Sequence, residues 1–264
     1  MRAGVWLEVS RLGAVLFALS SLVALADPCP AAAKQTCSKK DAAACLAAGD
    51  ALVATAECRT AALERYQQAC DQGSLRGCSK LAFRLVEKSR DAAVVKKAIG
   101  LFTKACDGGD VLGCSNLASF YWDGEGVAKD PKKSAQLSQK ACDGGDAFAC
   151  GTLGSLWAQG DLGTKDVDKA AALFKRACDG GSASGCNQLG NATAAGLGVP
   201  KSLDVALTLW TKACKEANAA ACTNAGRALR KKGDDRTADK AFKRACKLGD
   251  EDGCAEKGLA PPEE

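Results

Sequence analysis

Sixteen cysteines, in a 264-residue chain without histidine, are the residues whose type and spacing could do chemistry. Thiolates can attack substrates, hold metals or oxidise to disulfides. The absence of histidine excludes Ser-His and Cys-His catalysis, imidazole zinc sites and histidine-ligated haem. Structural zinc clusters usually place cysteines about two to four residues apart. Here seven pairs are each eight residues apart, which favours disulfides: Cys37/Cys45, Cys70/Cys78, Cys106/Cys114, Cys142/Cys150, Cys178/Cys186, Cys214/Cys222 and Cys246/Cys254.

The cysteine pairs recur at a nearly constant interval. Their first members advance by 33, 36, 36, 36, 36 and 32 residues. Such regularity is typical of a solenoid built from one repeated supersecondary unit. We predict repeat units at about 38–70, 71–106, 107–142, 143–178, 179–214 and 215–246, with a C-terminal cap at 247–264, inside a solenoid that spans 27–264.

Each unit shows two helical patterns. The stretch before the first cysteine of a pair, called helix B, has apolar residues at intervals of three and four, as in Ala170, Leu173, Phe174 and Ala177. It ends at Asp-Gly-Gly, where glycine can adopt the left-handed conformation that closes a helix. The next helix, helix A, carries the second cysteine, then a leucine and a small residue that lets a neighbouring helix approach. Its predicted caps are Asp110, Asp146 and Ser182.

Helix geometry decides how the cysteines pair. On one continuous helix, residues eight apart are separated by about 12 Å, beyond the roughly 7 Å that a disulfide tolerates. Chain reversal at Gly-Gly brings them together, so each disulfide should join helix B of one unit to helix A of the next. Cys29 and Cys58 fall outside this scheme. An eighth disulfide between them is one interpretation, and free or intermolecular thiols are the other.

The N-terminus resembles an export signal. A charged head precedes an apolar run from Leu12 to Leu25, and Ala24 and Ala26 occupy the −3 and −1 positions of a cleavage site. We predict a signal peptide at 1–26, a periplasmic or secreted location and no membrane span after its removal. Export to an oxidising compartment is also where disulfides persist. The net charge of +5, or +4 without the signal peptide, is too small to indicate nucleic-acid binding.

Residues Cys114 to Ala135 resemble a Sel1-like repeat. They combine a leucine and small residue, an aromatic residue, Gly-x-Gly-Val and a basic, alanine-containing helix. Gly196-Leu-Gly-Val199 repeats that loop, whereas units one, two and six lack it. The spacing of Ala-Cys and the following cysteine is similar to that of the cysteine-rich secreted branch, typified by Helicobacter cysteine-rich proteins. The resemblance covers residues 37 to 257. It implies a right-handed α/α superhelix related to tetratricopeptide repeats, with ligands held on the concave face and an adaptor function.

Some cysteine-rich members of that family are described as penicillin-binding proteins or β-lactamases, which is the alternative function. A serine β-lactamase uses Ser-x-x-Lys, Ser-Asp-Asn and Lys-Thr-Gly, and none of these occurs in the chain. A metallo-enzyme of that type uses histidines, which are absent. The glycine loops are interpreted as tight turns and not phosphate sites, because no strand precedes them. We therefore expect a protein without enzymatic activity or cofactor.

Binding residues are expected on the face of helix A opposite its core positions. Counted from the helix A cysteine, this face passes through positions +1, +5 and +8. It should have an apolar end in unit two, at Phe83 and Val86, and a basic end in unit six. The predicted binding residues are Ser115, Ser119, Trp122, Asn187, Asn191, Thr223 and Arg227. Amide side chains and a charged end are typical of peptide grooves. We predict a monomeric scaffold that binds a protein or peptide, and the other possibilities are the β-lactam-related function or a structural envelope component without a ligand.

Overall fold

The computed structural model describes residues 29, 37 and 41–259, and in these residues the fold is all-α. The helices A are α2 (Ala42–Val53), α4 (Leu75–Lys88), α6 (Val111–Asp123), α8 (Ala147–Gln159), α10 (Ala183–Ala195), α12 (Ala219–Lys231) and the short α14 (Glu251–Lys257). The helices B are α3 (Arg59–Asp71), α5 (Ala92–Asp107), α7 (Pro131–Asp143), α9 (Val167–Asp179), α11 (Leu203–Lys215) and α13 (Asp235–Lys247), with a 3-10 turn η1 (Ala56–Cys58) before α3. The predicted signal peptide lies outside the described residues. Within them, no helix combines the length and hydropathy that a membrane crossing requires.

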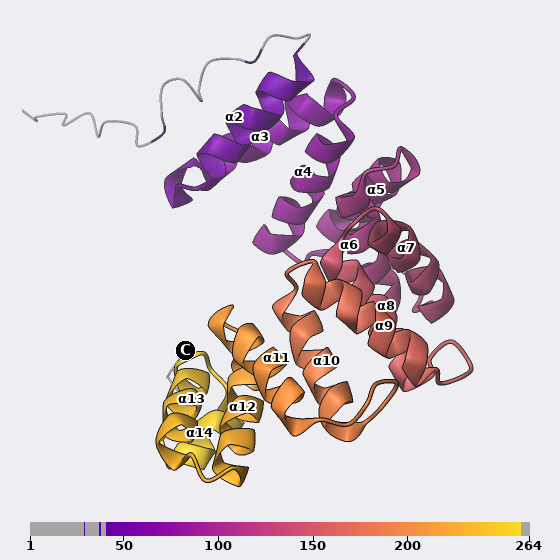
Figure 1. Ribbon diagram of the computed structural model, residues 1–264. Helices are drawn as coiled ribbons and strands as arrows, with labels where there is room; N and C mark the ends of the chain where they lie inside the picture. Colours follow the sequence, from indigo (N-terminus) through magenta and orange to yellow (C-terminus); the bar gives the residue numbers. More distant parts are fainter. Residues whose placement is uncertain (1–28, 30–36, 38–40, 260–264) are drawn as a thin grey trace, which may run out of the picture.

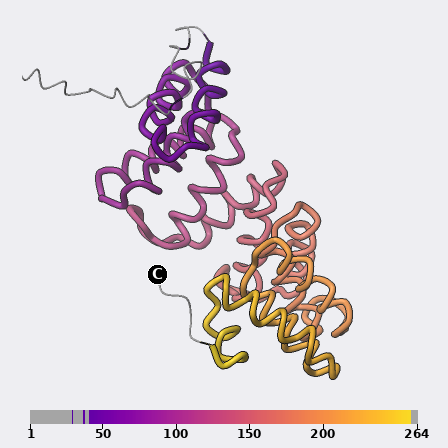
Figure 2. The backbone as a smooth tube through the Cα atoms, turned by 90° about the vertical axis from the view of Figure 1, so that its left-hand side faces the viewer, coloured from indigo at the N-terminus to yellow at the C-terminus, as the bar shows by residue number. Residues whose placement is uncertain are grey.

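The helices pack in consecutive antiparallel pairs along a curved path (Figure 1). In the side view the first pair and the last helices lie at opposite ends of the molecule (Figure 2). Each helix packs on the one before and the one after it in the chain. Helices A of neighbouring units also pack on each other, as α4 does on α6 and α8 on α10, whereas no two helices B in the described chain do so to the same extent. Helices A therefore form the inner layer of the solenoid and helices B the outer layer.

The turns between units follow the predicted chemistry. The side chains of Asp110, Asp146 and Ser182 accept hydrogen bonds from the first turn of α6, α8 and α10. The second glycine of each Gly-Gly, such as Gly145, has a positive φ, here 92°, which suits a residue without Cβ. The loop glycines also permit close contact, because a Cβ on Gly198 would lie 2.2 Å from the Val167 carbonyl oxygen. The chain reversal at each cysteine pair is thus encoded by short local motifs.

Small residues on helices A accept large side chains from helices B. A Cβ added to Gly154 would lie 2.7 Å from the Phe174 ring, and one added to Gly190 would lie 2.6 Å from Trp210 Nε1. Gly49 with Tyr66 and Gly226 with Phe242 repeat the arrangement. The predicted function of the small residue after leucine is therefore confirmed. The core is made of these aromatic side chains, leucines, alanines and cystines.

All sixteen cysteines are in eight disulfides. Cys29 bonds to Cys58, and the other seven bonds join the cysteines eight residues apart: Cys37 to Cys45, Cys70 to Cys78, Cys106 to Cys114, Cys142 to Cys150, Cys178 to Cys186, Cys214 to Cys222 and Cys246 to Cys254. From the bond between Cys70 and Cys78 onward, each joins helix B of one pair to helix A of the next, and the Cα atoms are 4.3 to 4.7 Å apart. Each helix B is therefore held to its own helix A by packing and to the next helix A by a covalent bond.

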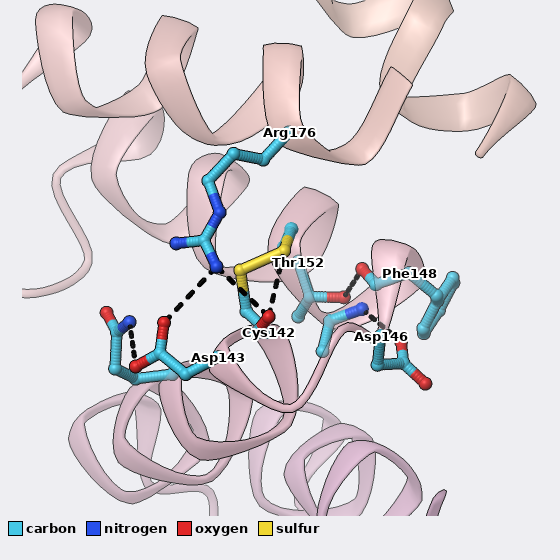
Figure 3. The surroundings of a disulfide bond; sticks show 9 residues. Cys142, Asp143, Asp146, Phe148, Thr152 and Arg176 are labelled. Carbon is cyan, nitrogen blue, oxygen red and sulfur yellow. Dashed lines mark hydrogen bonds and ion pairs between the residues drawn. A yellow bond between two sulfur atoms is a disulfide. The ribbon is translucent and has the colours of Figure 1, made fainter. Parts of the chain in front are cut away.

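Basic side chains link successive helices B at the same end. Arg176 Nη2 donates to the Cys142 carbonyl oxygen at 3.1 Å and contacts Asp143 Oδ1 at 3.2 Å (Figure 3). Lys140, Lys212 and Arg244 make the same contact to the preceding helix B cysteine carbonyl. Carbonyls at a helix C-terminus have no intrahelical donor and carry partial negative charge, so a cation there is stabilising. In α7, α9, α11 and α13 the basic residue two before the cysteine is an inter-unit link that the sequence analysis missed.

Candidate binding surface

The helix A cysteines lie in the core and not on a surface that a ligand could reach. Each is the second member of a pair, and each is at most 3% exposed: Cys45 (0%), Cys78 (0%), Cys114 (1%), Cys150 (3%), Cys186 (1%), Cys222 (0%) and Cys254 (1%). The sequence analysis predicted that these cysteines form disulfides, and the structure confirms it, since their side chains are oxidised and buried. They are structural cystines that hold neighbouring units together.

Position +1 of helix A is buried in α4, α6 and α12 and is not open to a ligand there. Ser115 is 5% exposed and Thr223 is 2% exposed. The cause is the approach of the next helix A: Thr223 Oγ1 donates to Asp250 Oδ1, the cap of α14, at 2.7 Å. Ser79 makes the equivalent bond to Asp110, the cap of α6. Ser115 and Thr223 were predicted as binding residues, and their burial shows that this part of the prediction is wrong. They belong to the contact between neighbouring units.

The open face of α10 and α12 includes positions +2 and +5, and in α10 also position +1, where Asn187 is half-buried. An amide cluster, Asn187, Asn191 and Asn224, spans α10 and α12. Asn224 Nδ2 donates to the side-chain oxygens of both Asn187 and Asn191 at 3.1 Å. Asn191 Oδ1 also accepts from the Trp210 indole at 3.0 Å. These bonds leave the Asn187 amide group and the Asn224 side-chain oxygen without a protein partner among the described residues. The two predicted asparagines are brought together, and Asn224 is a member that the prediction missed.

A cavity of about 410 Å³ adjoins Asn191. Its apolar lining comes from α8, α9, α10 and the loop after α10, and includes Ala158, Ala171, Phe174 and Leu197. Gln159, Gln188 and Asn191 supply polar groups, and Lys165 is the one charged side chain of its lining. Leu197, in the glycine loop, is 45% exposed. An apolar cavity bordered by amides can hold an apolar side chain while the amides bond to a polypeptide backbone.

Ser119 and Trp122 occupy separate surroundings. Ser119 is half-buried and lines a smaller cavity of about 110 Å³ with Asn116 and Phe83. The Trp122 ring is half-buried, and Lys129 Nζ lies 4.8 Å from its centroid. That contact is a cation–π interaction within one helix-loop segment. Ser119 therefore remains near the inner surface, whereas Trp122 is already in contact with a cation of its own unit.

The predicted basic end is neutralised by the C-terminal cap. Arg227 Nη2 lies 3.0 Å from Asp252 Oδ2, and Arg227 Nε lies 2.8 Å from Glu256 Oε1. Arg230 pairs with the same Glu256 at 2.6 Å. The hydrogen bond to Glu256 is the main cause that raises the pKa of Arg227, and the same bond lowers the pKa of the Glu256 carboxyl. Arg227 is exposed, but its charge is compensated by the acidic residues of α14. The sequence pattern did not predict that α14 lies beside Arg227.

Reactive groups are few in the described chain. The cysteines are oxidised, so no thiolate is available as a nucleophile or metal ligand. No set of three or more His, Cys, Asp or Glu side chains among residues 29, 37 and 41–259 is arranged to hold a metal ion. The Tyr66 hydroxyl donates to Asp50 Oδ1 at 2.8 Å, and burial together with this bond raises its pKa. A tyrosine with a raised pKa stays protonated and acts as a donor.

Comparison with known families identifies the repeat. The Sel1 repeat model matches residues 60–74, 81–110, 111–146, 149–182 and 183–218, which is more than half of the chain. The chain belongs to the Sel1 repeat family. No curated protein matches the sequence significantly. Membership in the Sel1 family, whose units form repeat scaffolds, suggests a function in protein–protein interaction.

Two solved structures have a fold similar to that of this chain. A Sel1 repeat protein from Oxalobacter formigenes is 19% identical, with a TM-score of 0.69 over 78% of this chain and 86% of that one. A protective antigen of uropathogenic Escherichia coli with an SLR fold is 24% identical, with a TM-score of 0.68 over 85% of this chain. The present chain covers 51% of the length of that antigen. Helicobacter pylori cysteine-rich protein B is 28% identical over 61% of this chain and 96% of that one, with a TM-score of 0.34.

Proposed function

We propose that this protein is an exported, periplasmic or secreted Sel1 scaffold that binds an extended segment of a partner protein along its inner, helix A surface. The eight disulfides support export, because such bonds persist in oxidising compartments. The observation that carries the binding proposal is the amide cluster beside the 410 Å³ cavity.

The amide cluster and the cavity bind different parts of a partner segment, its backbone and an apolar side chain. A partner backbone offers alternating carbonyl oxygens and N–H groups, and the Asn187 amide and the Asn224 oxygen can bond to one of each. A side chain of leucine or phenylalanine size would enter the cavity, where burial of apolar area supplies affinity. The nearly neutral lining favours a partner segment that is uncharged at this point.

The test is a selection of displayed random peptides on the purified, oxidised protein, followed by measurement of Kd for the selected peptides. Two variants probe the surface: Asn187→Ala with Gln188→Ala, and Ala195→Trp, which fills the cavity from the exposed end of α10. Asn191 is kept, because its loss would leave the buried Trp210 indole without an acceptor. We expect each variant to weaken binding by roughly 1 to 3 kcal/mol.

The control is Gln136→Ala, an exposed amide on the outer helix α7 that lines none of the cavities described. It should leave the Kd unchanged, and circular dichroism should show all variants folded. If no peptide is enriched, or if the selected peptides bind the two surface variants as well as the unchanged protein, this surface is not the binding site.

A further inference from the structure

Two joined cavities lie at the other end of the inner surface. The first, of about 340 Å³, is lined by residues that include Arg59 and Leu63 of α3 and Lys88 of α4. The second, of about 370 Å³, is lined by residues of α2, α3, α4 and α6 that include Tyr66, Phe83 and Leu112. Val53 and Arg84 line both, so the cavities are neighbours and share a wall. Neither is part of the amide cluster or of the cavity beside Asn191.

The second cavity presents an exposed aromatic ring. Phe83 is 42% exposed, although it is a large apolar side chain, and Val53 and Leu112 beside it are half-buried. Phe83 lies on the face of α4 that points away from the helix B layer, where packing of the fold does not require it. A cluster of large apolar side chains at an open cavity is typical of a surface that is covered by a partner.

The charges around the cavities do not balance. Four cations and two acids line them: Arg59, Lys80, Arg84, Lys88, Asp50 and Glu87. Lys80 pairs with Asp50 at 2.5 Å, and Arg84 pairs with Glu87 at 2.6 Å. Both acids are thereby compensated, and Arg59 and Lys88 have no ion pair within the described part of the chain. The excess of two positive charges contrasts with α12, where the acids of α14 pair with Arg227 and Arg230.

We propose that these cavities bind a segment of a partner protein that carries a large apolar side chain followed by carboxylates. The apolar side chain lies against Phe83 in the second cavity, and the carboxylates pair with Arg59 and Lys88 over the first. This rests on the proposed function, because the segment continues along the same inner surface. It adds the chemistry of the partner at the N-terminal end, where unpaired cations select acidic residues.

Defined probes test this proposal directly. The probe is a fluorescein-labelled peptide with blocked ends, Trp-Leu-Glu-Asp-Glu, and its affinity is measured by fluorescence anisotropy. Two comparison peptides separate the contributions: Trp-Leu-Lys-Lys-Lys inverts the charge, and Gly-Ser-Glu-Asp-Glu removes the apolar part. We expect the acidic apolar peptide to bind at least about tenfold more tightly than either, and its affinity to fall as salt screens the exposed cations.

Substitutions in the protein then test which residues the probe peptide contacts. Arg59→Glu with Lys88→Glu should weaken the probe about tenfold, because two attractive contacts become repulsive. Phe83→Ala should weaken it about fivefold or more. Matched controls should leave the probe affinity unchanged: Lys96→Glu with Lys132→Glu on the outer helices, and Phe148→Ala, an exposed ring on α8 that lines neither cavity.

Equal binding of the peptide that lacks apolar residues would show charge attraction alone and would overturn the proposal. So would equal weakening by the control charge reversals. These outcomes differ from failure of the proposed function. The proposed function is tested by the affinity of the selected peptides for the amide cluster variants, which lie at the other end of the surface. One outcome would refute only this inference: the selected peptides bind the amide cluster variants more weakly, but the acidic probe binds the Phe83→Ala variant as tightly as the unchanged protein.

Discussion

Removal of the central disulfide, by Cys142→Ala with Cys150→Ala, should lower stability locally. The bond joins α7 to α8 in the middle of the array. Its sulfurs are buried, since the two residues are 1% and 3% exposed. Because repeat units contact mainly their neighbours, removal of one disulfide should reduce stability most in the two units that it joins.

The magnitude follows from the short loop that the bond closes. The two cysteines are eight residues apart, so a loop of about nine residues is released, and the chain-entropy relation gives about 2.6 kcal/mol. Loss of two buried sulfur atoms removes apolar contacts worth about 1 kcal/mol. The expected decrease in the free energy of unfolding is thus about 3 to 4 kcal/mol.

Hydrogen exchange measured by mass spectrometry resolves where this loss falls. Amides of α6 to α9 should lose protection, while those of α2, α3 and α13 should not. The matched control is Cys246→Ala with Cys254→Ala, which opens a loop of the same length at the C-terminal end. It should deprotect α13 and α14 instead. Equal deprotection from α2 to α14 in the central variant, or a decrease below about 1 kcal/mol, would refute the local-contact argument.

Three further outcomes are expected. Arg176→Met, which removes the bond to the Cys142 carbonyl but keeps an apolar stem, should destabilise the protein by about 1 kcal/mol in chemical denaturation, whereas Lys132→Met should not. Leu153→Ala should cost about 2 to 4 kcal/mol by the same measurement, because Leu153 is 2% exposed and a cavity would remain; a loss under about 1 kcal/mol would contradict its core position. The pKa of Glu256 is lowered by its hydrogen bond to Arg227, so this bond stabilises the fold above the ordinary value of 4.5 and the stabilisation is lost as pH falls through the folded-state pKa. Protection of α14 should therefore decrease on acidification, and Glu256→Gln should remove that part of the pH dependence; an unchanged pH profile in the variant would exclude this pair as the cause.

Much of the fold could be predicted from the sequence because its signals are local. The spacing of eight, the Gly-Gly reversal and the caps at Asp110, Asp146 and Ser182 act within about ten residues, and the structure contains them as predicted. The aromatic residues of helices B and the small residues of helices A also pair as their periodicity indicates. Interactions this close in sequence depend on helix geometry alone.

The surface depended on contacts between residues one unit apart, which no local pattern specifies. A Cβ on Gly113 would lie 3.0 Å from Ser79 Oγ, so the close approach of successive helices A buries position +1 at Ser79. The sequence alone determined which residues lie on helices A. It also determined that cysteines eight residues apart pair with each other. Only the tertiary structure decided that Asn224 joins Asn187 and that α14 neutralises Arg227, because the rotation of each unit on the next is set by packing between helices of successive units.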